Sequence, residues 1–443
     1  MKKIIPALIL SMLSACSSIP TRLAPVEKEL KTGGSTTSQF HSILYYPSEL
    51  SLKYDGYIIG VEKSPLDSVT VYGDVHIKPI LDSGLSSNKA SNKILDSKIL
   101  YVSHIIKNYG EQGSTNNCEI YNAYKIKETP VMQLAQPCPI EITNTPATRT
   151  AIFKNSWLAM DNLKQSLSKR VQKKTYSHIV VIVMGWNTVQ EESARNFNSI
   201  ATNLARASGP NFNPLIIGVT WPSQWNSAWV EPIFRLFSFP AKAADADELG
   251  LTWLGVLLNE TIPDANTNLP VVVIGHSFGS RASSVAACVG PVIYDSNPNR
   301  QRAKIDTLIN LQGAFRSKRL FNQEDDAGFH YPNQCSNVSN VVLTASTYDQ
   351  AVNKSFWGLY AGEEKSFLKN CPNTTSSKIK CAKVNEHGQI TPVPNGISNS
   401  NITYIEASDL IKENAYQTGG GAHSDIYRPE HGVFMNNIIN RNF

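Results

Sequence analysis

Residues 269–288 read LPVVVIGHSFGSRASSVAAC and contain the pattern G-x-S-x-G, with Ser277 at its centre. The four branched apolar residues ahead of the pattern predict a strand that is buried on both faces, and the small residues after it predict a helix. A serine at such a turn presents its hydroxyl at the end of a sheet, and glycines on both sides of it let strand and helix approach closely. We therefore predict that Ser277 is a catalytic nucleophile at the carboxyl end of a buried strand.

Apolar runs of strand length alternate with helical stretches on both sides of this turn. Strands that are continuous in Val and Ile, with helices between them, predict a doubly wound, mostly parallel sheet of the α/β class. We assign this α/β domain to residues 148–443, and residues 41–147, which hold short β-like runs and no chemical motif, to a β-rich N-terminal segment. The predicted strands are 178–184, 215–220, 271–274, 307–311, 341–344 and 402–405, and the predicted helices are 156–169, 191–207, 248–259 and 281–288.

A second segment, IVVIVMGWN at 179–187, supports a family resemblance. Together with the Ser277 motif it resembles the α/β-hydrolase family, in particular bacterial serine esterases and lipases with an H-G-[FYW]-N motif on an early strand. Met184 stands where that family usually has His. The resemblance implies that the oxyanion hole is formed by the N–H groups of Phe278, which follows the nucleophile, and of Trp186, which follows the early glycine.

The resemblance also implies that the acid and then the base follow Ser277 in the chain. The base is expected after the last predicted strand, where His423 follows a run of glycines at 419–421. His431 is the main alternative, and His330 and His387 are weaker ones.

The acid is expected in a turn after a buried strand that lies between the nucleophile and the base. Asp349 fits, because it closely follows the predicted strand at 341–344. Its carboxylate would orient the imidazole and stabilise the imidazolium. Asp326 and Asp325 are the alternatives, because some lipases carry the acid after the preceding strand.

Six aromatic residues lie at 221–239, in the first part of the long insertion between the predicted strands at 215–220 and 271–274. Three interpretations stay open for this insertion: a lid or acyl-chain groove over Ser277, a helix packed into the core, or a patch that sits on a membrane surface. The aromatic residues are Trp221, Trp225, Trp229, Phe234, Phe237 and Phe239.

The N-terminus resembles that of a bacterial lipoprotein. Two lysines, a short apolar stretch at 4–13 and the sequence LSAC at 13–16 predict a signal peptide at 1–15 that ends before a lipidated Cys16. Acyl chains such as palmitate on Cys16 would anchor the protein in a membrane, and residues 16–40 would form a flexible tether. Ser17 resembles the pattern that sorts lipoproteins to the outer membrane, so we expect a lipid-anchored protein of the bacterial cell envelope.

Six cysteines remain after Cys16, an even number that suggests disulfides in an oxidising compartment. We favour the pairs Cys118–Cys138 and Cys371–Cys381, because each would close a short loop. Cys288 lies on an apolar helix and is the residue that we most expect to be a buried free thiol. The cysteine spacings do not resemble a zinc site, and no metal or cofactor is implied.

The composition excludes several classes of protein. Of the 443 residues, 41% are hydrophobic and 17% are charged, which excludes a disordered chain and a coiled coil. The net charge of +5 includes no basic run, so we expect no nucleic-acid partner. The sequence thus predicts a serine hydrolase that cleaves acyl esters or lipids through an acyl-enzyme. The alternative is a surface lipoprotein in which a non-catalytic hydrolase scaffold binds a partner.

Overall fold

The computed structural model describes most of the chain after residue 50. The predicted signal peptide at 1–15, Cys16 and the predicted tether at 16–40 lie outside the described residues, as does Trp186. The described residues are 51–63, 76–96, 100–122, 136–139, 152–185, 188, 190–223, 242–265, 268–325, 328–352, 359–371, 379–393, 399–413 and 420–441.

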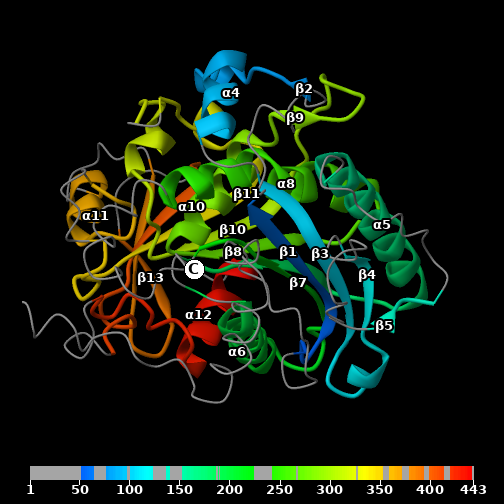
Figure 1. Cartoon of the computed structure of the whole chain (residues 1–443). Helices are drawn as coiled ribbons and strands as arrows, with labels where there is room; N and C mark the ends of the chain where they lie inside the picture. Colours follow the sequence, from blue (N-terminus) through cyan, green and yellow to red (C-terminus); the bar gives the residue numbers. More distant parts are fainter. Residues whose placement is uncertain are drawn as a thin grey trace, which may run out of the picture.

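Within this part of the chain, twelve strands form one mixed sheet (Figure 1). Neighbouring strands from β12 to β1 are parallel, and the antiparallel pairs lie toward the two edges. The predicted doubly wound α/β fold, that of an α/β-hydrolase, is confirmed. In spatial order the strands are β13 (Ile390–Val393), β12 (Lys380–Val384), β14 (Ile402–Glu406), β11 (Val338–Ala345), β10 (Ile305–Leu311), β8 (Val271–His276), β6 (His178–Val183), β7 (Pro214–Thr220), β1 (Asp55–Lys63), β3 (Leu100–Tyr109), β4 (Cys118–Asn122) and β5 (Gln136–Pro137).

Strands of the N-terminal segment extend this same sheet. The first of them, β1, lies parallel to β7, with Ile58 opposite Gly218. Strands β3 and β4 then continue the sheet in antiparallel fashion. The β-like runs that carry no chemical motif therefore lengthen the sheet that holds Ser277.

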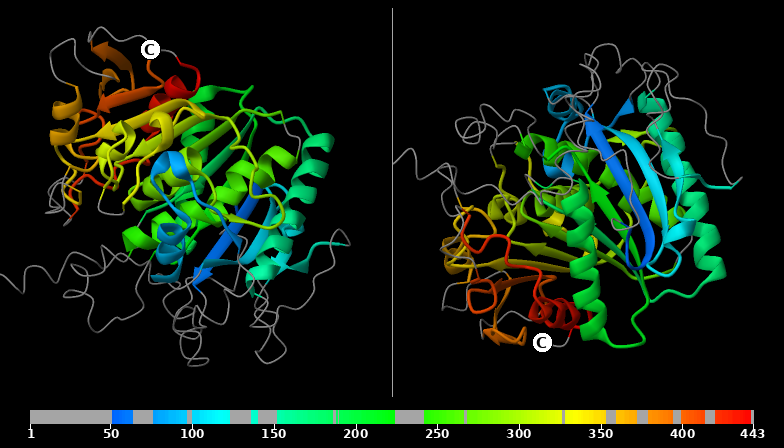
Figure 2. Two further views of the ribbon diagram at one scale, coloured as in Figure 1. Left: turned by 90° about the horizontal axis from the view of Figure 1, so that it is seen from above. Right: turned by 60° about the horizontal axis from the view of Figure 1, so that its bottom comes forward.

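Helices cover both faces of the sheet, as Figures 1 and 2 show. Along β6, alternate residues face two separate cores: Val181 lies in the core with α5 (Ile152–Lys173) and α10 (Phe278–Ser284), and Val180 in the core with α6 (Gln190–Ser208) and α12 (Pro429–Ile439). A strand that is apolar at every position requires such burial on both faces. The other elements are α4 (Ser87–Asp96), α8 (Trp253–Val256), α9 (Ile262–Asp264), α11 (Glu364–Asn370), β2 (His76–Ile77), β9 (Ile293–Tyr294), the 3-10 turns η3 (Leu81–Ser83), η4 (Ser114–Asn116), η8 (Ser317–Phe321) and η9 (Pro332–Gln334), and the π-helical turns η6 (Leu257–Thr261) and η7 (Val285–Val289).

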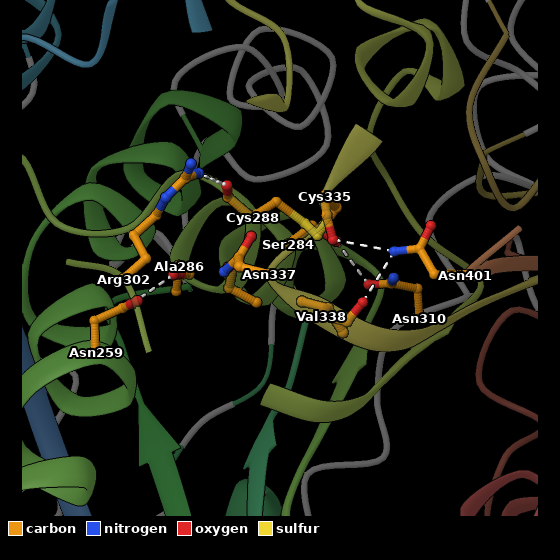
Figure 3. Close-up of a disulfide and its surroundings, with 11 residues drawn as sticks. Asn259, Ser284, Ala286, Cys288, Arg302, Asn310, Cys335, Asn337, Val338 and Asn401 are labelled. Carbon is orange, nitrogen blue, oxygen red and sulfur yellow. Dashed lines mark hydrogen bonds between the residues drawn. A yellow bond between two sulfur atoms is a disulfide. The ribbon is translucent and has the colours of Figure 1, made fainter. Parts of the chain in front are cut away.

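Three disulfides link the described residues. Cys118–Cys138 and Cys371–Cys381 are paired as predicted. The expectation for Cys288 is wrong, because this residue is not a free thiol and is bonded to Cys335 (Figure 3). The helix of α10 and η7 ends against the turn that precedes β11, which brings the two Cα atoms to 4.5 Å.

The Cys288–Cys335 disulfide therefore ties the helix that follows Ser277 to the strand that leads to Asp349. Hydrogen bonds hold both ends, as Figure 3 shows. Arg302 donates to the carbonyl of Cys288, and the amide of Asn401 donates to the carbonyl of Cys335 at 3.2 Å.

A buried ion network holds the same helix through Arg281. Asp247 accepts bidentate hydrogen bonds from Arg281 on α10 and from Arg319, at 2.8–3.1 Å. Arg319 also donates to Asp325 and lies over the ring of Phe329, with its guanidinium carbon 4.2 Å from the ring centroid. Buried charges are tolerated when each is paired in this way, and removing one partner would leave the others uncompensated.

Candidate active site

Ser277 occupies a strained turn between β8 and α10. Its φ and ψ are 56° and −123°, a conformation that is rare for a residue with a side chain. The turn is held from both sides by main-chain hydrogen bonds: Ser277 donates to the carbonyl of Leu311 at 3.0 Å, and Ala314 donates to the carbonyl of Ser277 at 3.1 Å. The end of β10 and the loop after it thus keep the serine in its strained geometry.

The two glycines of the motif permit this turn. A Cβ on Gly275 would lie 2.6 Å from the Cα atom of Ser280, and one on Gly279 would lie 2.1 Å from the carbonyl oxygen of Val183. Both distances are below van der Waals contact, so a side chain at either position would push α10 away from β8 or β6.

The end of β6 lies directly against Ser277. A Cβ on Gly185 would lie 2.5 Å from Ser277 Cβ and 3.1 Å from Ser277 Oγ. Met184, the departure from the family pattern, is buried, and its carbonyl accepts a 2.8 Å hydrogen bond from the indole of Trp221. Trp221 itself is buried in the core, whereas the other five residues of the aromatic insertion lie outside the described residues.

Of the two expected oxyanion donors, one can be placed. Phe278 is the buried first residue of α10. N–H groups at a helix N-terminus have no acceptor within their own helix and favour negative charge nearby. The position of this N–H next to Ser277 is compatible with oxyanion binding.

His423 and Asp349 form a hydrogen-bonded pair, with 2.8 Å between His423 Nδ1 and Asp349 Oδ2. Asp349 is completely buried, whereas the His423 side chain is 13% exposed. Asp349 lies in the loop after β11, and His423 lies in the loop that contains Gly421. A β-bridge between Asp349 and Gly421 joins these two loops. Gly421 has a φ of 61°, and a Cβ there would lie 2.4 Å from the carbonyl oxygen of Tyr348, so this bridge requires a glycine.

Four donors surround the Asp349 carboxylate. Its Oδ1 accepts from the main-chain N–H groups of Ala351 and Val352, at 3.0 and 3.3 Å. Its Oδ2 accepts from His423 and from Gln312 Nε2, the latter at 2.9 Å. An ionised carboxylate has about four lone-pair positions, so these four donors occupy its capacity as an acceptor. The carboxylate can then hold His423 Nδ1 as a donor, which leaves the lone pair of a neutral imidazole on Nε2.

His276, the residue before Ser277, contacts His423 directly. Its Nε2 donates to the carbonyl oxygen of His423 at 2.8 Å, and the two ring centroids are 4.8 Å apart. Burial, and to a smaller extent the charge of the neighbouring His423, lowers the pKa of His276 to about 3. Its imidazole is therefore neutral at physiological pH. The turn with Ser277 and the loop with His423 are therefore adjacent.

The alternative bases lie elsewhere. His431 is buried on α12, and burial lowers its pKa to about 4, although the negative charge of Asp425 acts to raise it. His330 Nε2 donates to the carbonyl of Asp82 at 2.9 Å, and His387 is largely exposed. Among the described carboxylates, Asp349 is the one that contacts His423.

Of the two alternative acids, Asp325 is the one that the structure describes. Asp325 belongs to the ion network with Arg319. Asp326 lies outside the described residues. Sequence reasoning gave no role to His276 or Gln312, because nothing in the local sequence marks a residue whose partner is 147 or 37 positions away.

Two features are absent from the described ranges. No helix there is both long and apolar enough to cross a membrane. No three His, Cys, Asp or Glu side chains are grouped there in a way that could hold a metal ion.

Comparison with known proteins supports the α/β-hydrolase fold. Residues 159–309 match the model of a family described as an alpha/beta hydrolase of unknown function (DUF900). This match includes β6, Gly185 and the Ser277 turn, and it ends before Asp349 and His423. No curated protein and no solved structure matches the chain.

Proposed function

We propose that this protein, whose fold is that of an α/β-hydrolase, is a serine hydrolase with Ser277 as nucleophile, His423 as base and Asp349 as acid. The observation that carries the proposal is the 2.8 Å hydrogen bond between His423 Nδ1 and the buried Asp349 carboxylate, next to the strained turn of Ser277. A nucleophile, a base and a group that orients the base are the parts that acyl transfer requires.

The proposed reaction proceeds in two halves. His423 Nε2 takes the hydroxyl proton as Ser277 Oγ attacks the acyl carbonyl, and the resulting oxyanion is stabilised by the N–H groups of Phe278 and Trp186. His423 then gives its proton to the leaving alcohol, and an acyl-enzyme remains on Ser277. Water, deprotonated by the same imidazole, releases the acid and restores the serine.

The substrate class that we propose is acyl esters, including lipids. Two features of the sequence support it: the aromatic residues in the insertion after Trp221, and the LSAC sequence at 13–16, which would hold the enzyme near lipids of the cell envelope. The bacterial outer membrane is the location that we propose, with the anchor on Cys16.

Labelling with a fluorophosphonate probe and peptide mapping test the nucleophile. We expect the probe on Ser277, and we expect Ser277→Ala to abolish both labelling and hydrolysis of p-nitrophenyl esters. Loss of a triad serine lowers kcat by about a millionfold in a well-studied protease. Labelling that persists in Ser277→Ala would contradict the proposal, and a folded wild-type protein that takes no label would favour the non-catalytic scaffold.

The base and the acid are tested by amide substitutions with a matched control. His423→Gln and Asp349→Asn should each lower kcat by about ten-thousandfold, because the serine loses its base or the base loses its orientation. His431→Gln, a similar change at the competing histidine, should leave kcat unchanged. The reverse pattern would assign the base to His431.

The anchor needs a separate test, because it lies outside the described residues. In cells fed a radioactive palmitate, we expect the wild-type protein to incorporate label and to enter the detergent phase. Cys16→Ser should remove both properties while Ser277 still reacts with the probe. Label retained by Cys16→Ser would contradict lipidation at this cysteine.

A further inference from the structure

Gln312 lies at a position where a residue with a side chain is under strain. It directly follows β10, it is completely buried, and its φ is 49°. A left-handed conformation at a residue other than Gly, Asn or Asp costs about 1–3 kcal/mol and persists when the surroundings enforce it. Such residues cluster at functional sites.

Thr344 holds the side chain of Gln312 in one orientation. The main-chain N–H of Gln312 donates to Thr344 Oγ1 at 3.0 Å, and the same hydroxyl donates to Gln312 Oε1 at 2.9 Å. The opposite end of the amide, Nε2, donates to Asp349 Oδ2 at 2.9 Å. Since a carboxylate only accepts, the amide must present Nε2 to Asp349, which leaves Oε1 as the acceptor that faces the Thr344 hydroxyl.

Close packing of the main chain leaves Gln312 little room to move. A Cβ on Gly362 would lie 2.9 Å from the carbonyl carbon of Gln312, so the neighbouring loop is pressed against its backbone. The N–H of Gly362 donates to the carbonyl of Gly313 at 3.0 Å. The strained backbone, the threonine and the loop together aim one N–H bond at one carboxylate oxygen.

We propose that Gln312 is a positioning residue for the Asp349–His423 pair, and that it sets how strongly this carboxylate attracts the proton of His423. The proposal rests on the proposed function. Gln312 Nε2 and His423 Nδ1 share Oδ2, so the amide withdraws negative charge from the oxygen that holds the imidazole. Without the amide, Asp349 would hold a protonated His423 more tightly and could rotate about its side chain.

The sign of the effect follows directly. When Asp349 holds protonated His423 more tightly, the base loses its proton at a higher pH. The acid limb of the pH–rate profile therefore moves to higher pH. His276 and Glu363 are titratable side chains close to the cluster. Burial lowers the pKa of His276 to about 3, and the carboxylate of Glu363, next to Gly362, accepts the main-chain N–H of Tyr360 at 3.1 Å.

The test is the rate of fluorophosphonate labelling of Ser277 between pH 5 and pH 9 in the full chain. In Gln312→Leu we expect the acid limb to move upward by about half a pH unit, so that labelling at low pH falls about threefold more than at high pH. Thr344→Val, which keeps the glutamine and removes the hydroxyl that orients it, should shift the limb in the same direction by less. Thr307→Val, the same change at a buried position near the other end of β10, should leave the limb in place.

A second readout needs no turnover. The pH midpoint of the His423 ring resonances, assigned with His423→Gln, should rise in Gln312→Leu by the same amount as the limb. If Gln312→Leu does not fold, Thr344→Val provides both measurements.

The outcomes separate this inference from the proposed function. Suppose that Gln312→Leu labels more slowly by the same factor at every pH, with the midpoints of the rate profile and of the His423 resonances unchanged. This result would show a structural role for Gln312 and overturn the inference, whereas labelling of Ser277 would still support the proposed function. Wild-type protein without label on Ser277 would overturn the proposed function, and with it a positioning role, whatever the His423 resonances show.

Discussion

His276 Nε2 donates a 2.8 Å hydrogen bond to the main-chain carbonyl of His423, and the two imidazoles lie 4.8 Å apart between centroids. His276 immediately precedes Ser277, so this contact joins the turn with the proposed nucleophile to the loop with the proposed base. The loop also hydrogen-bonds to the turn after β11 through Ala422 and Tyr348, at 2.9 Å. His423 is thus held by its main chain on one side and by its ring on the other.

Two substitutions at His276 separate the ring from the hydrogen bond. His276→Phe keeps an aromatic ring and loses the N–H donor, which is worth about 1 kcal/mol between neutral groups. We expect labelling of Ser277 to slow about fivefold, and the free energy of unfolding in urea at pH 7 to fall by about 1 kcal/mol. His276→Gln, which can restore the donor, should recover part of the rate. A His276→Phe protein that reacts at the wild-type rate would show that the contact does not position His423.

Gly185→Ala tests the close approach of β6 to the serine. The added methyl group would lie 2.5 Å from Ser277 Cβ, so β6 or the turn must shift. We expect labelling to fall at least about a hundredfold, because displacing an oxyanion donor or the serine costs about 3 kcal/mol of transition-state stabilisation. Gly209→Ala is the matched control: a Cβ there meets nothing within 4 Å, although its φ of 78° costs some stability. It should label at the wild-type rate, and equal losses in both variants would contradict the explanation.

Acid should destabilise the fold through buried histidines. Burial lowers the pKa of His104 and His276 to about 3 and that of His431 to about 4, below the ordinary value near 6.5. The unfolded chain therefore binds protons first, and stability is lost as the pH falls from about 6.5 toward 4, at about 1.4 kcal/mol per pH unit for each histidine. Urea unfolding at pH 7, 6 and 5 measures this slope.

A single substitution checks the origin of that slope. His431→Leu places an apolar side chain in the buried site on α12 and should reduce the slope by about one proton. Asp349, His423 and Ser277 are unchanged in this variant, so labelling at pH 7 should be preserved. Stability that does not change between pH 7 and pH 5 would show that these histidines titrate alike in the folded and unfolded chains.

Removing the disulfides one at a time should give unequal losses. Cys288–Cys335 closes a loop of 47 residues and Cys371–Cys381 one of 10, and the chain-entropy model gives about 4 and about 2.7 kcal/mol for them. We therefore expect Cys288→Ala/Cys335→Ala to lower the free energy of unfolding more than Cys371→Ala/Cys381→Ala, measured in urea without reductant. The opposite order would mean that native packing, rather than loop closure, dominates the contribution of these disulfides.

Local patterns were enough to predict much of the fold. The Val and Ile runs at 179–183 and 271–274 predicted β6 and β8, because a strand that is covered on both faces must be apolar on both of them. The Ser277 turn followed from its two glycines, since the approach of strand to helix excludes a Cβ at both positions. Two disulfides were predicted because short loops bring their ends together.

The remaining features depend on contacts between distant segments. The extension of the sheet by β1 and β3, the Cys288–Cys335 bond and the donors His276 and Gln312 all join residues that no local pattern connects. Periodicity and turn chemistry act over a few residues, so they specify strands, helices and the sharp bend at Ser277. Which side chains meet across the sheet is determined by the order of the strands and by the packing of whole helices and strands. Both are properties of the folded chain and not of any local stretch of sequence.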